Sequence, residues 1–370
     1  MISDLYQLSI FSRTPSNMIF SVNNGEYTVW LPIYSLNPNL SIFLEIGEFT
    51  LSLAVMIFSS VTSYTIASKP AFHPNLNILI FIVIFSWSAS AIGRLFIKFG
   101  TWQFSGNFSN INCINSTAIN NWWTSDVTKM TSLGSPLEAW PLFMGGAFTW
   151  YYMILLNTCL LFISIERRFA TWLIENYENT ARVYLRVLLI FGQQILIFSL
   201  VYVTFFNLIN FLAMAGFLVA MNIFATWLFV GNRFTNLRIL REFDRNSMLP
   251  VRFQAMENLR VFDLTLRIFL VGFIGIIFVF TCVIILVFDF FPEFDIFIVY
   301  FFDNMIHLNP LVTCPVLIFS VSTWSKALLR LSWISKFNKM TSENAHKVHP
   351  KPTQQQETDT YFLQLNKSWE

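Results

Sequence analysis

LLIFGQQILIFSLVYVTFFNLINFLAMAGFLVAMNIFATWLFV, residues 188–230, is a run of 43 residues without a charged side chain. One helix crosses the hydrocarbon of a bilayer with about 20 apolar residues, so this run has about twice the length of one crossing. Arginines flank it on both sides, four of them in residues 165–187 and seven in residues 231–267. Basic connections gather on the cytoplasmic face of a membrane, so both flanks are expected on that side. The run is therefore predicted to be a hairpin of two helices that turns near 207–210.

Five more apolar segments are each long enough for one crossing. They are residues 40–67, 76–97, 140–164, 268–288 and 296–320. The composition excludes a soluble globular protein, because 55% of the chain is hydrophobic, only 12% is charged and the mean hydropathy is +0.56. The sequence therefore predicts an all-α membrane protein, a bundle of seven transmembrane helices.

The basic residues also predict the orientation of this bundle. Of the 23 Lys and Arg residues, 19 lie on alternate connections and the tail, three lie on the other connections, and Arg94 lies within a span. This bias predicts the N-terminus outside and the C-terminus inside. The expected parts are an extracellular segment (1–39), the bundle (40–323), an amphipathic helix on the membrane surface (324–338) and a disordered cytoplasmic tail (339–370).

Ionisable side chains are costly to place in hydrocarbon, and five of them lie within the predicted spans. They are Glu45, Glu48, Arg94, Asp303 and His307, all in the outer halves of the first, second and last spans. If these spans are neighbours, Arg94 can pair with Glu48 or Asp303. The cluster has two interpretations: an extracellular-facing pocket, or a buried ion pair that locks three helices together.

The third predicted span carries a block of aromatic residues, Phe148, Trp150, Tyr151 and Tyr152. Aromatic rings with polar tips can line an apolar cavity, and they serve equally in packing between helices. The candidate ligand-binding residues are Glu48, Arg94, Trp150, Tyr151, Asp303 and His307.

The third span ends in Ser164-Ile165-Glu166-Arg167-Arg168, at its predicted cytoplasmic boundary. An arginine there can pair with the neighbouring acid at rest and turn to a partner protein when the helices shift. It can also be an ordinary positively charged anchor. The Arg-rich connection expected over residues 231–267 is a second candidate docking surface, for a cytoplasmic protein or for anionic lipid.

We expect no enzyme activity, metal or cofactor, and no nucleic-acid binding. Of the four histidines only His307 lies in a span, so a metal hydrolase within the membrane would lack ligands. No Ser or Cys has a base at a spacing that proposes a nucleophile. The sequons at Asn39, Asn107 and Asn115 lie on the predicted outer side and are candidate glycosylation sites.

Three stretches carry a family resemblance. They are Trp30-Leu31-Pro32-Ile33-Tyr34, Ile165-Glu166-Arg167-Arg168-Phe169-Ala170-Thr171 followed by Glu175-Asn176-Tyr177-Glu178, and His307-Leu308-Asn309-Pro310. With them the chain resembles the nematode serpentine chemoreceptors of the epsilon class, which are seven-helix G-protein-coupled receptors. The resemblance implies that Glu166, Arg167 and Arg168 take part in G-protein coupling, and that Asn309-Pro310 kinks the last span.

The match to the wider receptor superfamily is partial. Arg168 and Thr313 stand where the superfamily motifs have Tyr, and the sixth span has no Pro between Leu264 and Phe291. Cys113 has no predicted extracellular partner. These departures distinguish the chain from the usual switch motifs of the superfamily.

The resemblance implies a chemosensory receptor in the plasma membrane of sensory neurons. Its expected partners are a small external chemical, a heterotrimeric G protein and membrane lipids. The alternatives are a seven-span ligand-gated channel or transporter and a membrane scaffold or chaperone without a ligand. A channel is expected to carry a polar stripe along a whole span, whereas the charges here are confined to outer halves.

Overall fold

The computed structural model describes residues 19–22, 27–30, 38–108, 131–133, 137, 140–174, 183–209, 211–242, 249–287, 290–291 and 294–330. The chain divides into two compact units, Met1–Ser325 and Lys326–Glu370. The second unit is described as far as Arg330.

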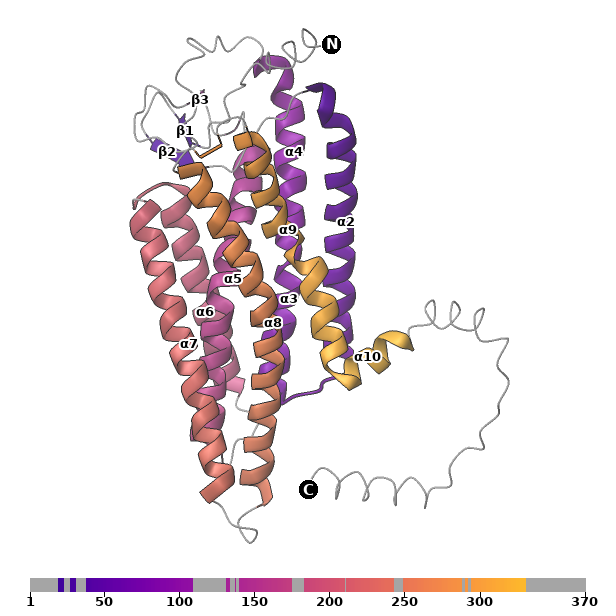
Figure 1. Cartoon of the computed structure of the whole chain (residues 1–370), viewed down its shortest axis with the longest axis vertical. Coiled ribbons are helices and arrows are strands. Elements are labelled where there is room, and N and C mark those ends of the chain that lie inside the picture. Colours follow the sequence, from indigo (N-terminus) through magenta and orange to yellow (C-terminus); the bar gives the residue numbers. More distant parts are fainter. Residues whose placement is uncertain are drawn as a thin grey trace, which may run out of the picture. The chain divides into compact units, whose positions relative to one another are not determined.

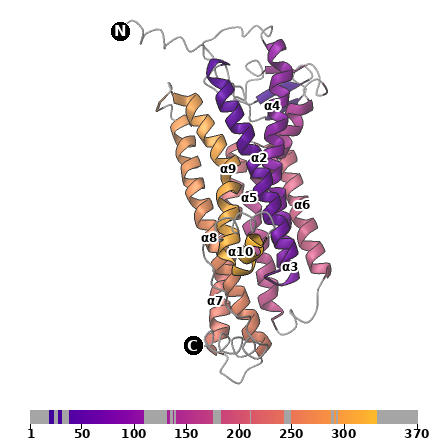
Figure 2. The same ribbon diagram turned by 90° about the vertical axis from the view of Figure 1, so that its right-hand side faces the viewer.

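Nearly all of the described chain is helical. The helices are α2 (Pro38–Ser68), α3 (Pro74–Ser86), α4 (Ser88–Phe108), α5 (Trp140–Trp172), α6 (Val183–Phe205), α7 (Phe211–Glu242), α8 (Leu249–Val287), α9 (Asp295–Ser320) and α10 (Ser322–Leu329). With α3 and α4 counted as one rod, α2 to α9 supply the seven predicted segments of the bundle. They run side by side, up and down in turn (Figures 1 and 2). The predicted fold class is confirmed.

Several helices are suited to a membrane. Within the described residues, five segments are long and apolar enough to cross one: Ile46–Ser68, Pro74–Gly100, Trp140–Trp172, Val183–Phe205 and Ala213–Glu242. The pair Asn304–Ser320 and Ser322–Leu329, bent by 105°, would count as a sixth. Large apolar side chains such as Phe191, Ile195 and Phe198 of α6 are exposed, as expected of a surface that faces lipid.

The 43-residue run without charge forms the predicted hairpin. Helix α6 ends at Phe205 and α7 begins at Phe211, so the turn lies where the sequence placed it. Asn207 has φ 51°, in the left-handed region that asparagine tolerates better than most residues. This position lets the chain reverse within a few residues.

The second predicted span is broken into two helices. The backbone N–H of Trp87 bonds to the carbonyls of Ile84 and Phe85, and α4 starts at the next residue. The Ser88 hydroxyl donates to the Phe85 carbonyl at 2.6 Å. Such local bonds from a serine compete with the helical pattern and favour a break.

Helices α4 and α5 approach each other closely at two glycines. A Cβ atom on Gly93 would lie 2.9 Å from the Gly145 carbonyl oxygen, and one on Gly145 would lie 2.8 Å from the Gly93 carbonyl oxygen. Only glycine fits at both positions, which is the small-residue packing typical of membrane helices. This contact fixes α4, the helix that carries Arg94, against α5.

Two connections are shorter than the sequence predicted. Helix α4 continues to Phe108, past the predicted end of its span at residue 97. The prediction of an Arg-rich connection over residues 231–267 is wrong, because α7 continues to Glu242 and α8 begins at Leu249. Arginine is a strong helix former and Arg238 pairs with Glu242 one turn later, so this polar stretch extends both helices.

A small sheet was not predicted. Strand β1 (Ile19–Val22) pairs antiparallel with β2 (Tyr27–Trp30) and parallel with β3 (Thr131–Leu133). Figure 1 shows these strands at the end of the bundle where α2 and α9 begin. We call this end the sheet end. The opposite end, where α5 finishes, is called the Arg167 end.

The apolar core lies between α3, α5, α6, α7 and α8. Its buried members are Leu79, Leu160, Leu161, Phe162, Ala170, Leu185, Leu189, Met221, Ala225, Phe229 and Phe262. This core holds α5, α7 and α8 together just where the polar residues at the Arg167 end begin.

Candidate functional site

The Arg167 end contains a buried ion pair between adjacent residues of α5. Glu166 is 0% exposed and Arg167 is 3% exposed. Arg167 Nη2 donates to Glu166 Oε1 at 2.6 Å, and Arg167 Nε donates to Oε2 of the same carboxylate. Arg167 Nη1 is then directed to α8, where it donates to Asn258 Oδ1 at 3.0 Å.

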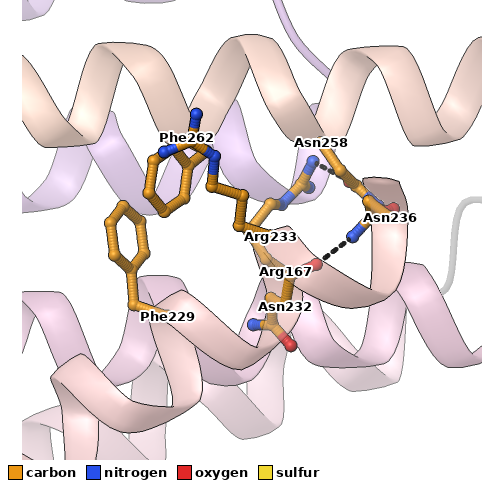
Figure 3. Close-up of a pocket in the computed structure, with 7 residues that line it drawn as sticks. All are labelled: Arg167, Phe229, Asn232, Arg233, Asn236, Asn258 and Phe262. Carbon is orange, nitrogen blue, oxygen red and sulfur yellow. Dashed lines mark hydrogen bonds between the residues drawn. The ribbon is translucent and has the colours of Figure 1, made fainter. Parts of the chain in front are cut away.

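Asn258 extends this ion pair into a network of amides. Asn258 Nδ2 donates to Asn236 Oδ1 of α7 at 2.9 Å and to Thr171 Oγ1 of α5 at 3.2 Å. Asn236 Nδ2 donates to Thr171 Oγ1 at 2.9 Å. Three helices, α5, α7 and α8, are thus tied together through buried polar side chains (Figure 3).

A small cavity opens beside this network. Its lining residues are Arg167, Phe229, Asn232, Arg233, Asn236, Asn258 and Phe262. The rings of Phe229 and Phe262 stack with centroids 4.2 Å apart, and the Arg233 guanidinium lies 4.6 Å from the Phe262 centroid, as Figure 3 shows. The cavity therefore has an apolar wall, a polar floor of amides and a cation at its rim.

The structure does not bring the three residues predicted for coupling into one cluster. Glu166 and Arg167 lie in the network, whereas Arg168 is exposed and faces away from it. Sequence reasoning missed Thr171, Asn236 and Asn258. A signal was present, since Asn232 and Asn236, like Gln254 and Asn258, stand four residues apart and so share one helical face.

The connection between α2 and α3 joins the same end of the bundle. The His73 backbone N–H donates to Glu257 Oε1 of α8 at 2.8 Å, and His73 Nδ1 accepts from the Asn75 N–H at 3.4 Å. Burial lowers the pKa of His73 below its usual 6.5, and nearby Arg167 and Arg186 act in the same direction while Glu166 and Glu257 oppose it. His73 thus favours the neutral form, which caps α3.

Trp324, at the start of α10, also contacts the connection between α2 and α3. Its Nε1 donates to the Lys69 carbonyl at 2.9 Å, and its ring meets Phe72 edge to face at 5.6 Å. Trp324 is fully buried. The α2–α3 connection is therefore held by α8 and by Trp324.

The sheet-end half of the bundle holds a second polar cluster. Arg94 Nη1 of α4 donates to Asn304 Oδ1 of α9 at 2.7 Å. One turn away, Ser90 Oγ and His307 Nδ1 are 2.6 Å apart. Arg94, His307 and Asn304 are all buried, so two of the predicted ligand-binding residues meet at the α4–α9 contact.

The other predicted ligand-binding residues are more dispersed. Glu48 of α2 is buried and pairs with Lys98 Nζ of α4 at 2.7 Å. Tyr151 is directed to α6, where its hydroxyl donates to Gln194 Oε1 at 2.9 Å. Trp150 is half-buried. Asp303 lies on α9, and its side chain is outside the described residues, as is that of Glu45 on α2.

The remaining predicted positions lie as follows. Asn309 and Pro310 are inside α9, which continues through both Pro310 and Pro315. Asn39 and Asn107 lie at the ends of helices α2 and α4, not in connections. Asn115 is outside the described residues. Within the described part of the chain, no group of three or more His, Cys, Asp or Glu side chains is placed to hold a metal ion.

Comparison with known proteins assigns the chain to a family. Residues 18–370 match the Sre G protein-coupled chemoreceptor family. The chain belongs to this family. It is thus a multi-pass membrane protein of the chemosensory serpentine receptors, as the sequence resemblance implied.

Relatives from Caenorhabditis elegans align along nearly their whole length. Serpentine receptor class epsilon-45 is 29% identical over 381 residues, which cover 95% of this chain and 100% of that receptor. Serpentine receptor class epsilon-38 is 27% identical over 94% of this chain and 99% of its own. Serpentine receptor class epsilon-29 is 28% identical over 95% of this chain and 100% of its own. No solved structure gives a significant match.

Proposed function

We propose that this protein is a plasma-membrane chemoreceptor that binds a small external compound at the sheet end and activates a heterotrimeric G protein at the Arg167 end. A compound has this effect when it binds one arrangement of the helices more tightly than another. The required coupling between the two ends is typically 1–3 kcal/mol, or about 5- to 150-fold in affinity.

The observation that carries the proposal is the network around Arg167. Glu166 and Arg167 neutralise each other within α5, and Asn258 joins the pair to α7 and α8. These few directional bonds close the bundle at its Arg167 end. Exchanging them gives a second arrangement, in which α8 moves away from α5. That movement uncovers Arg167 and the cavity beside it, a surface for a protein partner that only the open arrangement offers.

Contacts across the sheet-end half support binding of the compound there. We propose Glu48, Arg94, Trp150, Tyr151, Asp303 and His307 as the residues that the ligand contacts or displaces. The bonds Arg94–Asn304 and Ser90–His307 both cross from α4 to α9. A ligand that competes for one of these bonds changes the α4–α9 contact directly, without intermediate residues.

The orientation belongs to the same proposal. Positive charge bias supports the sheet end outside and the Arg167 end in the cytoplasm, where a G protein is found. In this orientation Asn39, Asn107 and Asn115 are accessible to glycosylation, and residues 324–338 lie on the inner membrane surface. The family supports sensory neurons as the site of expression.

The test combines topology with signalling. The full chain carries an epitope tag at each end, and antibody binding is compared between intact and permeabilised cells. The same cells then receive a panel of volatile and water-soluble compounds while G-protein activation and membrane current are recorded. Arg167→Ala is the test variant, and exposed Arg168→Ala is its matched control.

We expect the C-terminal tag to be reached only after permeabilisation, and a responding compound to lose its G-protein signal in Arg167→Ala but to keep most of it in Arg168→Ala. A C-terminus reached in intact cells would contradict the receptor orientation. A current that survives a block of G-protein signalling would favour the ligand-gated channel. Loss of signal in both variants at equal surface expression would remove Arg167 from its proposed role.

A further inference from the structure

Tyr152 of α5 contacts one turn of α9 in two ways. Its hydroxyl donates to the Ile306 carbonyl at 2.9 Å. Its ring stacks on His307 with centroids 6.2 Å apart and planes at 15°. Tyr152 is 0% exposed, so no water competes for these contacts.

The turn that Tyr152 contacts is the one that Pro310 weakens. In a helix, the N–H of residue 310 would donate to the carbonyl of residue 306, and proline has no N–H. A buried polar group left without a partner destabilises the fold, and in hydrocarbon no water can replace the donor. The Tyr152 hydroxyl supplies a donor to this carbonyl from another helix.

The same turn is held from a second side. His307, stacked on Tyr152, is bonded to Ser90 of α4, and Asn304, one turn earlier, is bonded to Arg94. Helix α5 continues from Tyr152 to Arg167, about 22 Å further along at 1.5 Å per residue. Tyr152 therefore lies where the sheet-end cluster, the Pro310 turn and the helix that carries Arg167 meet.

We propose that Tyr152 is a positioning residue for α9, whose hydroxyl replaces the helical donor that Pro310 removes and so joins movement of α9 to α5. This joint between α5 and α9, made by the bond from the Tyr152 hydroxyl to the Ile306 carbonyl, is a property of the folded chain alone. Its signalling consequence rests on the proposed receptor function, in which a change at His307 or Asn304 reaches Arg167 through this joint.

The test is a double-mutant cycle in the purified full chain in lipid nanodiscs, without ligand or G protein. Tyr152→Phe removes only the hydroxyl, and Pro310→Ala restores an N–H to α9. Amide hydrogen exchange in peptides that cover α9 is the readout. We expect Tyr152→Phe to accelerate exchange next to Pro310 by about fivefold, which corresponds to a net bond of about 1 kcal/mol.

In the Pro310→Ala background we expect Tyr152→Phe to change exchange less than twofold, because the helix then supplies its own donor. Tyr151→Phe is the matched control, since that hydroxyl bonds to Ser86 and Gln194 and not to α9. It is expected to leave α9 unchanged. This control uses the native Pro310 and stands even if Pro310→Ala does not fold.

Equal effects of Tyr152→Phe with and without Pro310, or equal effects of Tyr152→Phe and Tyr151→Phe on α9, would overturn the proposal. The cycle needs no agonist, so its outcome is independent of the chemoreceptor experiment above. Failure of the cycle removes the joint and leaves the receptor proposal intact, and failure of the signalling experiment leaves the joint intact.

Discussion

The two ends of the bundle each contain a buried arginine that donates to an asparagine of another helix. Arg94 of α4 bonds to Asn304 of α9 at 2.7 Å, and Arg167 of α5 bonds to Asn258 of α8 at 3.0 Å. The surroundings differ. Arg167 has its acid as the preceding residue and an amide network that reaches α7, whereas Arg94 lies on a helix locked to α5 by glycines.

This difference indicates different tasks for the two contacts. The Arg167 contact is made by directional bonds that can be exchanged for bonds to a partner. The Arg94 contact is made by α4, which packs on α5 without room for a methyl group at Gly93 or Gly145. In the proposed function, the sheet end therefore senses through α9, and the Arg167 end responds through α8.

The largest expected effect comes from breaking the ion pair at the Arg167 end. Arg167→Met leaves the Glu166 carboxylate buried without its cation, which typically costs about 3–5 kcal/mol of stability. Thermal unfolding of the purified protein in detergent measures this loss. Arg168→Met is the control, because an exposed side chain typically changes stability by less than about 0.5 kcal/mol.

The double variant Glu166→Gln with Arg167→Met sharpens this result. It removes the uncompensated charge, so we expect it to recover much of the lost stability. If the single and double variants unfold at the same temperature, the two side chains are not held together by their charges.

The next effect tests the close packing behind Arg94. Gly145→Ala places a methyl group against the Gly93 carbonyl and Ile97, and we expect it to destabilise the bundle by about 1–3 kcal/mol. Gly216→Ala is the control, since nothing lies within 4 Å of a Cβ atom there. Equal unfolding temperatures for the two alanine variants would contradict the locked α4–α5 contact.

A third prediction separates the two asparagines by signalling. Asn258→Leu and Asn304→Leu each remove an amide partner of a buried arginine, at about 1–3 kcal/mol each. Asn258 bonds α8 to α5, whereas Asn304 bonds α9 to α4. We therefore expect Asn258→Leu to raise basal G-protein activation. Asn304→Leu is expected to change the response to compounds while basal activation stays low. Raised basal activation in both variants would end the distinction between the two ends.

The smallest effect concerns pH at the Arg167 end. His73 has a lowered pKa in the folded chain, so the unfolded chain takes up a proton first as the pH falls below about 6.5. Stability that is fully present above pH 6.5 is therefore lost as the pH falls from there towards the folded pKa. His73→Asn keeps a side chain that caps α3 and cannot titrate.

We expect His73→Asn to unfold at a temperature that varies less between pH 7.5 and pH 5.5 than that of the unaltered protein. Melting curves at the two pH values test this. An identical pH dependence in both proteins would assign the effect to other groups.

Charge and hydropathy predicted the helices well because each is a local property of the chain. The uncharged run from residue 188 to 230, flanked by arginines, predicted both α6 and α7 and the turn near Asn207. The same reasoning failed for residues 231–267, where polar composition was interpreted as a connection. Polar residues also extend helices beyond a membrane, and hydropathy does not distinguish the two.

The site was predictable only where partners are close in sequence. Glu166 and Arg167 are adjacent, so their pairing needs no knowledge of the fold. The bond from Arg167 to Asn258 joins residues that only tertiary packing brings together. The contact of Tyr152 with α9 was missed for the same reason, although Pro310 signals a carbonyl in need of a donor.

The sheet and the glycine contact show two further limits. Asn24-Gly25 between β1 and β2 is a hairpin signal, but the partner strand β3 comes from far along the chain. Gly93 and Gly145 carry no local signal of their contact, since glycines are common in membrane helices. Both features depend on which helices become neighbours.

The distance between the ends of α5 and α8 tests the account most directly. Spin labels replace Trp172 and Arg260, both exposed, in a chain whose own cysteines are substituted, and the distance is measured in nanodiscs with and without a compound that evokes signalling. We predict that the compound moves the labels apart by about 1–5 Å, while labels on α4 and α5 near Gly93 and Gly145 keep their distance. An unchanged α5–α8 distance in the presence of an active compound would contradict the proposed movement of α8 away from α5.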